Sequence, residues 1–404
     1  MRIMFYTIEG FDTPNSNNHM IHRLLKAFLG SGDSIFLIES NRGGSEGNVP
    51  VDLACEENFK YVAIKRRFVD KLNFIARYIE GIKFFMHARK QWEQELSTID
   101  VCIVQSTPTA IFPILSLSIR HKKKVIFYIY DVFPNGIFEI TGMRKGVIYK
   151  MLHIAEKLAY RKCSRIIVLS EDMKDKLIMD GVDTSKIDVI VSWYDDKIIS
   201  EVSPDDNRFF KKYSIAPRRT YIQYAGNFGY TFDWRMVIAV AEILKERTDI
   251  VFHMIGSGTF EDQFKTEASK KQLQNIVFYP WQPLEIIMDV YSAATIALIP
   301  LSRNVVGNSH PSKASLLMAC GRTFICSGKP GSKLLEEYNS HRVGIGIPDD
   351  NPKLIAEAII EMVNNPKMLH DYEKRAFDYA RNELSFEVNI GKFQRSLLKA
   401  IAEN

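Results

Sequence analysis

A polar loop leads into a helix in the segment Thr295–Ser327, TIALIPLSRNVVGNSHPSKASLLMACGRTFICS. The segment predicts a buried strand at Thr295–Pro300, a loop rich in Gly, Ser and Asn, a helix that begins at Ser312, and a second apolar strand. Backbone N–H groups at the start of such a helix have no partners within it and suit a phosphate. Lys313 lies in the first turn, where the helix dipole disfavours a cation, so a bound anion would explain it. The segment predicts a site for a phosphate-bearing ligand.

Two further glycine-containing turns follow predicted strands. Gly226-Asn227-Phe228-Gly229 comes after a strand at Tyr221–Ala225, and Gly256-Ser257-Gly258 comes after one at Ile250–Ile255. Neither turn is a dinucleotide-binding GxGxxG fingerprint, and a glycine pair after a strand is often only a tight turn. In an open parallel sheet, however, ligands bind outside the carboxyl ends of the strands. We therefore expect the two turns and the loop before Ser312 to line one edge of a sheet.

Candidate residues in the first half of the chain also follow strands. Asp131 comes directly after a strand predicted at Val125–Tyr130, and it could contact a substrate or cap the turn that contains Pro134. A polar run opens the first helix, where helix capping and ligand contact are alternatives. This run is Asn15, Ser16, Asn17, Asn18 and His19. In the second half, His310 beside Pro311 is either a plain loop histidine or a further ligand contact.

The order of the predicted elements indicates the fold. Strand-like and helix-like segments alternate in the first half, and the alternation returns after the polar stretch Asp195–Arg219. Such alternation is typical of parallel sheets with helices on both faces. The chain is therefore expected to be α/β, with two doubly wound domains. The predicted strands are Ile3–Tyr6, Ser34–Ile38, Lys60–Ile64, Val101–Gln105, Val125–Tyr130 and Arg165–Leu169, then Tyr221–Ala225, Ile250–Ile255, Ile276–Tyr279, Ile296–Pro300 and Thr323–Ser327.

Length and composition agree with two soluble domains. A chain of 404 residues with 46% hydrophobic residues is too long for one ordinary core. No apolar run approaches the length of about 18 residues that indicates a membrane-spanning helix. Met1–Thr7 leads directly into a strand pattern rather than a signal peptide, so a cytoplasmic protein is expected. The five cysteines are widely spaced without a CxxC pair, which disfavours disulfides and zinc and predicts reduced, buried thiols.

The net charge of +5 is unevenly distributed. Lys65–Lys90 holds eight basic and two acidic residues, and its apolar residues recur at helical spacing, which predicts a basic amphipathic helix. Such a helix can lie on an anionic membrane, with Lys65, Arg66, Arg67 and Lys71 facing the lipid. The alternative is a helix that packs on the core and exposes a solvated charged face. Nucleic acid is disfavoured because no binding motif accompanies the charge.

Five segments of the second half follow one another in a characteristic order: YAGNFG, FHMIGSGTFEDQF, NIVFYPWQP, VYSAATIALIPL and GNSHPSKASLLMACGRTFICS. This order resembles the C-terminal domain of retaining glycosyltransferases of family four, which have the GT-B fold. The PSK tripeptide at Pro311–Lys313 is similar to that of a bacterial cell-surface polysaccharide branch. The first half is more loosely similar, through YDVFP at Tyr130–Pro134 and RIIVLSEDMKDKL at Arg165–Leu177.

The resemblance implies transfer of a sugar from a nucleotide diphosphate sugar, most often a UDP-sugar, with retained anomeric configuration and with no obligatory metal or cofactor. The acceptor would be a glycan or a lipid-linked oligosaccharide, and the enzyme would work in the cytoplasm, either free or peripherally on the inner face of the membrane. It also implies an acceptor-binding domain at 1–195, a linker at 196–217 and a nucleotide-sugar-binding domain at 218–383. The two domains would face an interdomain cleft, and a helix at 384–404 would cross back to the first domain.

The same resemblance assigns roles to the candidate residues. Lys313 would neutralise the departing diphosphate, and Asp131 would orient the acceptor hydroxyl or stabilise the positive anomeric carbon. The run from Asn15 to His19 would bind the acceptor. Residues implied to bind the donor are Gly226, Asn227, Gly229, Arg235, Gly256, Trp281, Gln282, Gly307, Asn308, Ser309, His310 and Ser312. The departing phosphate can take the acceptor proton in the same-face mechanism proposed for such enzymes, so no separate protein base is implied.

The chain departs from the family pattern at four positions. Asn227 and Phe232 stand where many members carry an Arg and a Lys for the diphosphate, although Arg235 is near enough in sequence to compensate. Asn308 and Leu316 stand where the Glu-x7-Glu motif places its carboxylates. Two alternatives to an active transferase follow. The chain could be a catalytically silent partner or scaffold of a sugar transferase complex, or a nucleotide-sugar epimerase of the same fold, for which the expected acidic and histidine groups are missing.

Overall fold

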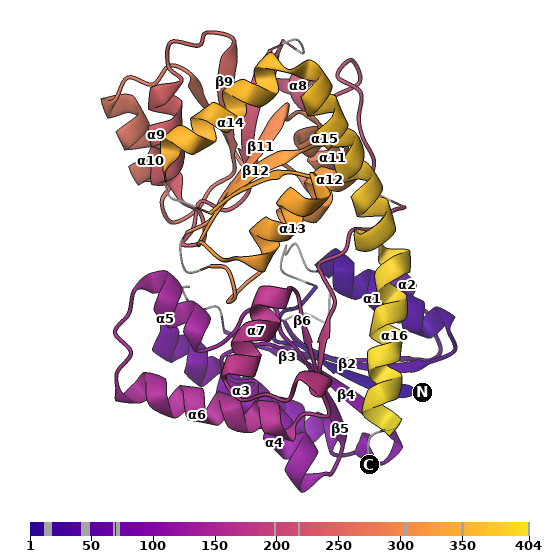
Figure 1. Cartoon of the computed structure of the whole chain (residues 1–404). Helices are drawn as coiled ribbons and strands as arrows, with labels where there is room; N and C mark the ends of the chain where they lie inside the picture. Colours follow the sequence, from indigo (N-terminus) through magenta and orange to yellow (C-terminus); the bar gives the residue numbers. More distant parts are fainter. Residues whose placement is uncertain are drawn as a thin grey trace. The chain divides into compact units, whose positions relative to one another are not determined.

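The chain forms two compact α/β units (Figure 1). This computed structural model describes residues 1–11, 18–41, 49–67, 69, 73–197, 199–216, 219–302, 305–348 and 351–402, without the side chains of His19 and Ile140. Unit 1 comprises residues 1–138, 143–191 and 389–404, and unit 2 comprises 139–142 and 192–388.

Unit 1 is built on a seven-stranded parallel sheet. The strands lie in the order β3-β2-β1-β4-β5-β6-β7, so the chain reverses direction across the sheet between β1 and β4. Their bounds are β1 Arg2–Tyr6, β2 Ser34–Asn41, β3 Phe59–Lys65, β4 Val101–Gln105, β5 Lys124–Tyr128, β6 Arg165–Val168 and β7 Ile187–Val189. The helices of this half of the chain are α1 Asn18–Gly30, α2 Val51–Ala54, α3 Phe74–Trp92, α4 Ile111–Leu115, α5 Asn135–Thr141, α6 Val147–Lys162 and α7 Glu171–Met179.

Unit 2 repeats the plan with a six-stranded parallel sheet in the order β10-β9-β8-β11-β12-β13. Its strands are β8 Thr220–Ala225, β9 Ile250–Ile255, β10 Ile276–Tyr279, β11 Ile296–Pro300, β12 Phe324–Ser327 and β13 Ile345–Ile347. The helices of this half of the chain are α8 Arg208–Tyr213, α9 Trp234–Ile243, α10 Glu261–Lys270, α11 Ile287–Ser292, α12 Lys313–Ala319, α13 Lys333–His341, α14 Pro352–Asn364, α15 Pro366–Tyr379 and α16 Phe386–Ala402. Both sheets are doubly wound, as the sequence predicted.

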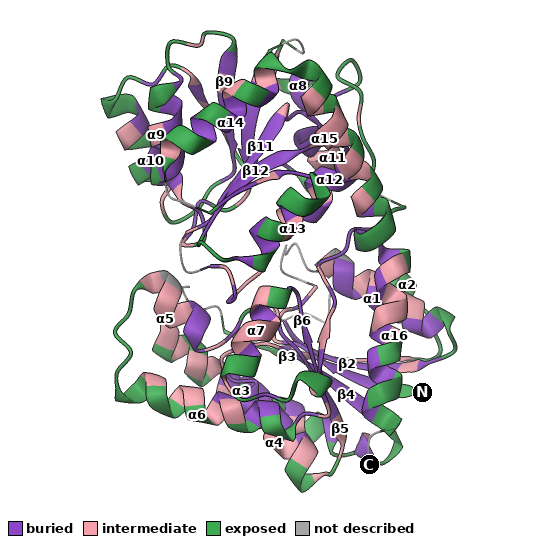
Figure 2. Ribbon diagram, viewed as in Figure 1, coloured by how far each residue is buried: buried purple, intermediate pink, exposed green. Residues whose placement is uncertain are grey.

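The inner strands of both sheets are buried because helices cover both faces (Figure 2), whereas the edge strand β3 is mostly only partly buried. All five residues of β4, VCIVQ, are buried, and β11, IALIP, is buried throughout. Continuous apolar runs of this kind are typical of parallel strands, which have no solvent face. The two strands that the sequence did not predict, β7 and β13, are three residues long and lie at sheet edges. Runs this short are too brief to show a period.

One stretch differs from its sequence-based expectation. The polar stretch expected as a linker contains α8, whose Phe209 and Phe210 are buried in unit 2 against Tyr221. From Asn389 onward α16 belongs to unit 1, where Phe393 packs on Phe28 and Tyr128 with ring centroids 5.9 Å and 5.3 Å apart. Buried aromatic side chains, rather than the polar character of their neighbours, decide where both segments pack.

The basic helix predicted within Lys65–Lys90 begins only at Phe74. Lys65 is the last residue of β3, Arg66 and Arg67 lie between β3 and α3, and Lys71 falls outside the described residues. Lys65, Arg66 and Arg67 therefore do not lie on the helix, which corrects the prediction for these three residues. On α3 itself Phe84 and Trp92 are buried, whereas Ile75, Ile79 and Met86 are exposed.

Helix α6 carries a buried acid, Glu156, which is 3% exposed. Burial raises the pKa of Glu156 from 4.5 to about 8, and the hydroxyl of Tyr160 opposes part of the shift. The folded protein therefore holds a proton that the unfolded chain releases, so stability from this group is complete below about pH 4.5 and falls as the pH rises toward about 8.

Four of the five cysteines are buried, but Cys55 is exposed, contrary to the expectation that all are buried.

We expect Glu156→Gln to remove this pH dependence. Between about pH 4.5 and about pH 8, the free energy of unfolding of wild type should fall relative to that of the variant by up to about 1.4 kcal/mol for each pH unit. The variant escapes this loss because Gln carries no charge to desolvate. Urea unfolding of both proteins at about pH 5 and about pH 7.5 measures the change. A difference that stays constant with pH would show that Glu156 does not titrate in this range.

None of the helices in the described part of the chain is long and apolar enough to cross a membrane.

Candidate functional site

Three loops meet at the carboxyl edge of the unit 2 sheet. Because β8 lies between β9 and β11, the segments that follow these strands are neighbours. The edge is extended by backbone hydrogen bonds beyond the strands, from Gly226 N to Ile255 O at 2.8 Å and from Phe228 N to Ser257 O at 2.9 Å. The prediction that the two glycine turns and the loop before Ser312 share one edge is confirmed.

Glycine is required in these turns for two reasons. Gly226, Gly256 and Gly258 have φ angles of +151°, +139° and +158°, which other residues rarely adopt. A Cβ atom at Gly256 would lie 2.0 Å from Gly226 O, and one at Gly258 would lie 2.4 Å from Asn227 Oδ1. The turns are therefore packed backbone against backbone, and the absence of side chains leaves their polar groups at the sheet edge.

Lys313 reaches this edge from α12. A Cβ atom at Gly226 would lie 2.2 Å from Lys313 Cε and 2.9 Å from Nζ, and Nζ lies 5.1 Å from the centre of the Tyr224 ring. The Tyr224 hydroxyl donates to Asn227 O at 2.9 Å, which holds the ring in place. The side chain of Lys313 thus lies across the glycine turn after β8, and only a residue without Cβ leaves room for it there.

The Lys313 ammonium has no carboxylate to neutralise it among the residues that the structure describes. Burial lowers its pKa from 10.5 to about 8, so the charged form is retained at neutral pH at a cost. A desolvated, uncompensated cation beside a glycine turn is well suited to an anion, because a bound phosphate would provide the missing counter-charge.

The loop before α12 contributes less than its sequence suggests. The N–H groups of Asn308 and Ser309 both donate to Val305 O, at 2.9 Å and 3.0 Å, so they are not available to a phosphate. Asn308 is 1% exposed, and its Nδ2 donates to Glu139 Oε2 at 2.6 Å. Gly307 has a φ of +83°, and Ser312 caps α12 without a side-chain hydrogen bond.

His310 is neutral in this setting. Burial lowers its pKa to about 4, and its buried Nδ1 has no hydrogen-bond partner among the described residues.

Backbone N–H groups that remain unused in the described part of unit 2 include those of Asn227 and Gly229, whereas Gly226 and Gly256 donate to Ile255 O and Tyr279 O. Asn227 and Gly229 are therefore the better candidates for a phosphate.

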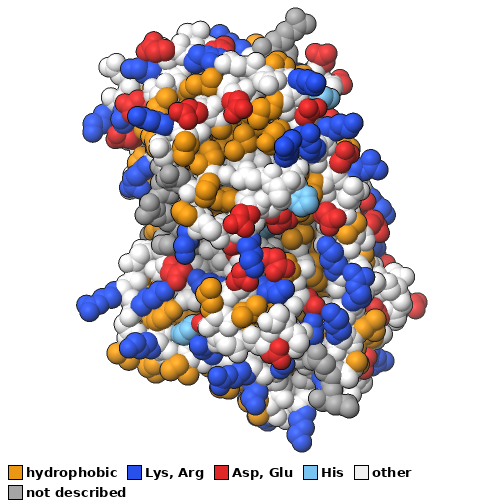
Figure 3. Space-filling model, in the orientation of Figure 1, with side chains coloured by type: hydrophobic (Ala, Val, Ile, Leu, Met, Phe, Trp, Pro, Cys, Tyr) orange, Lys and Arg blue, Asp and Glu red, His pale blue; other side chains and the backbone are white. Residues whose placement is uncertain are grey.

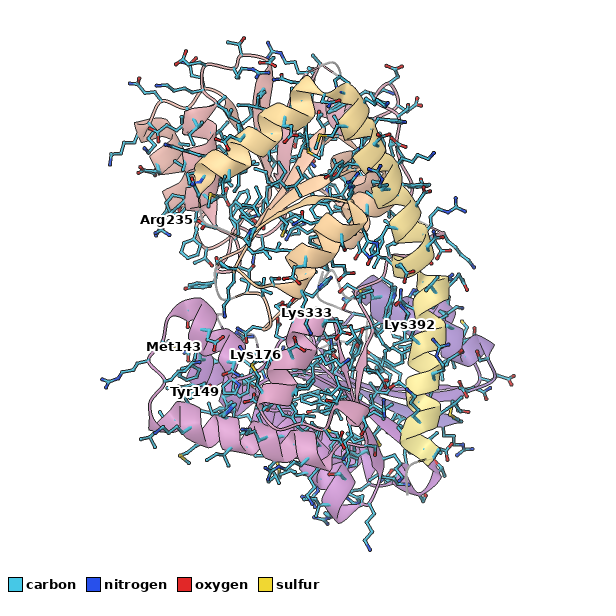
Figure 4. The ribbon with its side chains drawn as sticks, in the orientation of Figure 1. Met143, Tyr149, Lys176, Arg235, Lys333 and Lys392 are labelled. Carbon is cyan, nitrogen blue, oxygen red and sulfur yellow. The ribbon has the colours of Figure 1, made fainter. Side chains whose placement is uncertain are left out.

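The remaining predicted donor residues differ in availability. Trp281 is 58% exposed and can present its ring to a ligand. Gln282 is buried, and its amide bonds inside the protein: Oε1 accepts from Lys212 Nζ at 3.1 Å and Nε2 donates to the Tyr213 hydroxyl at 2.9 Å. Arg235 is exposed, its guanidinium lies 4.5 Å from the centre of the Trp234 ring, and it projects outward from unit 2 (Figure 4).

In unit 1 the predicted residues also lie at the carboxyl edge of the sheet. Asp131 is exposed, and its backbone N donates to Ser106 Oγ at 3.4 Å. Asn18 begins α1 and donates from Nδ2 to Gly10 O at 3.1 Å, as a structural contact would. Asn15, Ser16 and Asn17, and the side chain of His19, fall outside what the structure describes.

Several polar side chains at this edge of unit 1 were not predicted. Glu39 is 1% exposed and accepts from the Tyr61 hydroxyl at 2.5 Å and from Phe11 N at 3.1 Å, while Thr7 Oγ1 donates to Gln105 Oε1. In unit 2 the sequence reasoning also missed Tyr224. Glu39, Thr7, Gln105 and Tyr224 each lie at or near the carboxyl end of a buried strand. A polar or aromatic residue that interrupts an apolar run there could have indicated them from the sequence.

The two halves of the chain match two family models. Residues 18–197 match Glycosyltransferase Family 4, and residues 205–379 match Glycosyl transferases group 1. The chain carries two glycosyltransferase domains. No curated protein sequence matches the chain well enough to count as a relative.

Solved structures have the same GT-B architecture. Sucrose-phosphate synthase from Thermosynechococcus elongatus matches with a TM-score of 0.75 over 99% of each chain, at 12% identity. HepE from Anabaena in complex with UDP and glucose matches with a TM-score of 0.73 over 98% of this chain and 99% of that one, at 12% identity. WaaG, a glycosyltransferase involved in lipopolysaccharide biosynthesis, matches with a TM-score of 0.69 over both whole chains, also at 12% identity. At this identity the likeness shows the fold alone.

The glycosyltransferase domains keep their glycine turns but differ at the charged positions expected from the family. Phe232 is 3% exposed and stacks on Tyr224 with ring centroids 4.0 Å apart, so it belongs to the core of unit 2. Leu316 lies on α12 among buried neighbours. Lys313 is therefore the cation that the structure places against the glycine turn after β8, where the expected Arg and Lys are missing.

Proposed function

We propose that this protein is a retaining glycosyltransferase that transfers a sugar from a UDP-sugar to a glycan or lipid-linked oligosaccharide. The work would take place in the cytoplasm, as a step of bacterial surface polysaccharide or glycoconjugate synthesis. The observation that carries the proposal is the Lys313 ammonium, which lies across the Gly226 turn with no counter-ion among the described residues. The match to two glycosyltransferase family models and the UDP complexes of HepE support a nucleotide sugar as the donor.

Charge development in the reaction suits this arrangement. The bond between the anomeric carbon and the phosphate oxygen breaks, and its electron pair stays on the diphosphate. The acceptor oxygen bonds to the same face of the anomeric carbon, and its proton passes to the departing phosphate oxygen. Lys313, with the N–H groups of Asn227 and Gly229, would stabilise the negative charge in a desolvated site, where such groups have their largest effect.

Other roles remain part of the proposal. Asp131 of unit 1 would orient the acceptor hydroxyl. Trp281 would stack on the nucleotide base, since exposed aromatic rings bind bases through their faces. Ser309 would shape the loop, because its N–H group already donates to Val305 O, whereas Gly307, His310 and Ser312 would lie beside the donor. We expect turnover to persist with a chelator present, since a fixed cation replaces the metal.

Ligand-dependent stability and product analysis together test the proposal. UDP at about 100 times its dissociation constant should stabilise the protein by about 2.7 kcal/mol, and GDP should stabilise it less. Incubation with a panel of UDP-sugars and acceptor lipid extracts, followed by NMR of the product, should show that the anomeric configuration of the donor is kept. Inverted configuration would overturn the retaining assignment, and the lack of any shift with every nucleotide would overturn donor binding.

The affinity for UDP should depend on pH through Lys313. The ammonium form binds phosphate, and half of it is lost at about pH 8 in the free protein. We expect the dissociation constant to rise about tenfold for each pH unit above that point, because binding then requires uptake of a proton. Calorimetry between about pH 7 and about pH 9.5 measures this change, and Lys313→Met should bind weakly with no slope. An equally flat profile for wild type would exclude Lys313 as the titrating contact.

A catalytically silent partner of a transferase complex is the second candidate. Its support is the replacement of the expected acids by Asn308, whose amide is bonded to Glu139, and by Leu316. A silent partner would still be stabilised by UDP but would release no sugar from any donor, whereas the enzyme would do both.

A further inference from the structure

The outward face of α6 carries an apolar stripe. Its members are Val147, Ile148, Met151, Ile154 and Leu158, which are 74%, 71%, 66%, 67% and 40% exposed. Residues 147, 151, 154 and 158 recur at the spacing that places side chains on one face of a helix. Met143, four residues before the first residue of the helix, is also 37% exposed. We call the five side chains on the helix itself, without Met143, the α6 stripe.

The orientation of α6 is fixed by its opposite face. Ala159 and Tyr160 are buried there together with Glu156, Tyr149 stacks on His153 with ring centroids 5.5 Å apart, and the helix packs on α4. His153 Nε2 lies 3.1 Å from Asp180 Oδ1. Because these contacts hold a carboxyl and polar rings inward, the helix cannot turn its stripe to the core without exposing Tyr160 and breaking the His153 contact.

The exposed charged residues within 143–162 are all basic. Between Met143 and Lys162 the acidic residue is Glu156, which is buried, whereas Arg144, Lys145, Lys150, Arg161 and Lys162 are exposed. Lys150 and Arg161 lie along one side of the stripe and Lys162 along the other, by their positions on the helix. Lys157 is partly neutralised by Asp180 at 3.8 Å. Figure 3 shows hydrophobic side chains along the lower left margin, where Figure 1 places α6, with Lys and Arg side chains beside them.

We propose that the α6 stripe docks unit 1 on an anionic phospholipid surface. A helix with apolar side chains on its exposed face and basic side chains beside them can lie in the interface between headgroups and acyl chains. The basic side chains would contact anionic headgroups while the stripe enters the acyl boundary. A second copy of the chain fits less well, because a twofold contact through α6 would bring the basic rows of both copies together. The surface lies on α6 rather than on the Lys65–Lys90 stretch predicted from the sequence.

Vesicle flotation with the full chain tests this inference without any need for sugar transfer. Wild type should float with vesicles that contain phosphatidylglycerol, bind phosphatidylcholine vesicles weakly, and dissociate as salt rises, because charge attraction to the surface is screened. Met151→Glu and Ile154→Glu should each weaken binding by about tenfold to hundredfold, as expected for keeping one large apolar side chain out of the acyl region. Lys150→Glu and Arg161→Glu should each weaken binding to the anionic vesicles by at least about fivefold.

The control is Val51→Glu. Val51 is an apolar residue of the same unit and is 77% exposed, but it lies on α2, which packs on α1 and β3 and is not part of the α6 stripe. It should bind vesicles as wild type does. All of these positions are exposed, so each variant should keep the melting temperature of wild type, and that measurement confirms folding. Failure of wild type to float with anionic vesicles, or unchanged flotation of Met151→Glu and Ile154→Glu, would overturn the proposal. So would sedimentation as a dimer that Met151→Glu converts to a monomer, since the stripe would then be a contact between copies.

Discussion

Replacing Lys313 with methionine should abolish sugar transfer while leaving the fold intact or more stable. In the part of the chain that the structure describes, the ammonium lies across the Gly226 turn without a carboxylate partner, and burial has already lowered its pKa to about 8. An apolar side chain of similar length removes that desolvation cost, so the melting temperature should stay the same or rise. The charge that stabilises the departing diphosphate is lost at the same time. We expect kcat/KM to fall by about 10²–10³, as for the loss of one preorganised donor.

Stability and activity must be measured together for this variant. The matched control is Lys270→Ala, a change at an exposed lysine in the last turn of α10. It should leave both quantities unchanged. The dissociation constant for UDP should rise about tenfold to hundredfold in Lys313→Met, as charge-assisted hydrogen bonds contribute about 1.5–3 kcal/mol. Unchanged turnover in a folded Lys313→Met protein would remove the phosphate role, and reduced stability would mean that the cation has a partner in the fold.

Gly256→Ala is expected to be the most destabilising single methyl addition in unit 2. The new Cβ would lie 2.0 Å from Gly226 O and 2.9 Å from Gly226 C, both of them backbone atoms that cannot move independently of β8. The φ of +139° adds strain for any residue with a Cβ atom. Together these effects should cost about 2–6 kcal/mol. Because Gly226 also supports Lys313, affinity for UDP should fall as well.

Urea unfolding followed by tryptophan fluorescence suits this test. Trp193, Trp234 and Trp281 belong to unit 2 and Trp92 to unit 1, so the fluorescence reports mainly on the unit that carries the change. The control is Gly30→Ala, at the last residue of α1, where a Cβ atom meets nothing within 4 Å. That change should be neutral or slightly stabilising, since alanine favours a helix. A Gly256→Ala protein as stable as wild type would show that the β8 and β9 turns can separate freely.

Much of the fold follows from periodicity. Buried parallel strands need continuous apolar runs, and VCIVQ and IALIP were recognised for that reason. The glycine turns could be predicted because they follow such runs, and a turn after a parallel strand lies at the carboxyl edge of its sheet. The strands at Ile187–Val189 and Ile345–Ile347 could not be predicted, since three residues carry no period.

The candidate site could be predicted only in part. Lys313 was identified from its place at a helix start, but the same reasoning assigned the Asn308 and Ser309 N–H groups to phosphate, and both donate to Val305 O. The family resemblance implied that Gln282 contacts the donor, but its amide bonds to Lys212 and Tyr213 instead. Hydrogen bonds between segments far apart in the sequence decide which polar groups remain for a ligand.

The sequence by itself determined two doubly wound α/β domains and the glycine turns at their sheet edges, because both are local consequences of pattern and backbone freedom. Only the tertiary structure decided which charges and apolar residues are available. In the folded chain Lys313 lies against Gly226, and the regularly spaced apolar residues of α6 are exposed while Glu156 is buried. Helical spacing is the same for a core face and for an exposed face, so the side that is buried depends on what the rest of the chain packs against it.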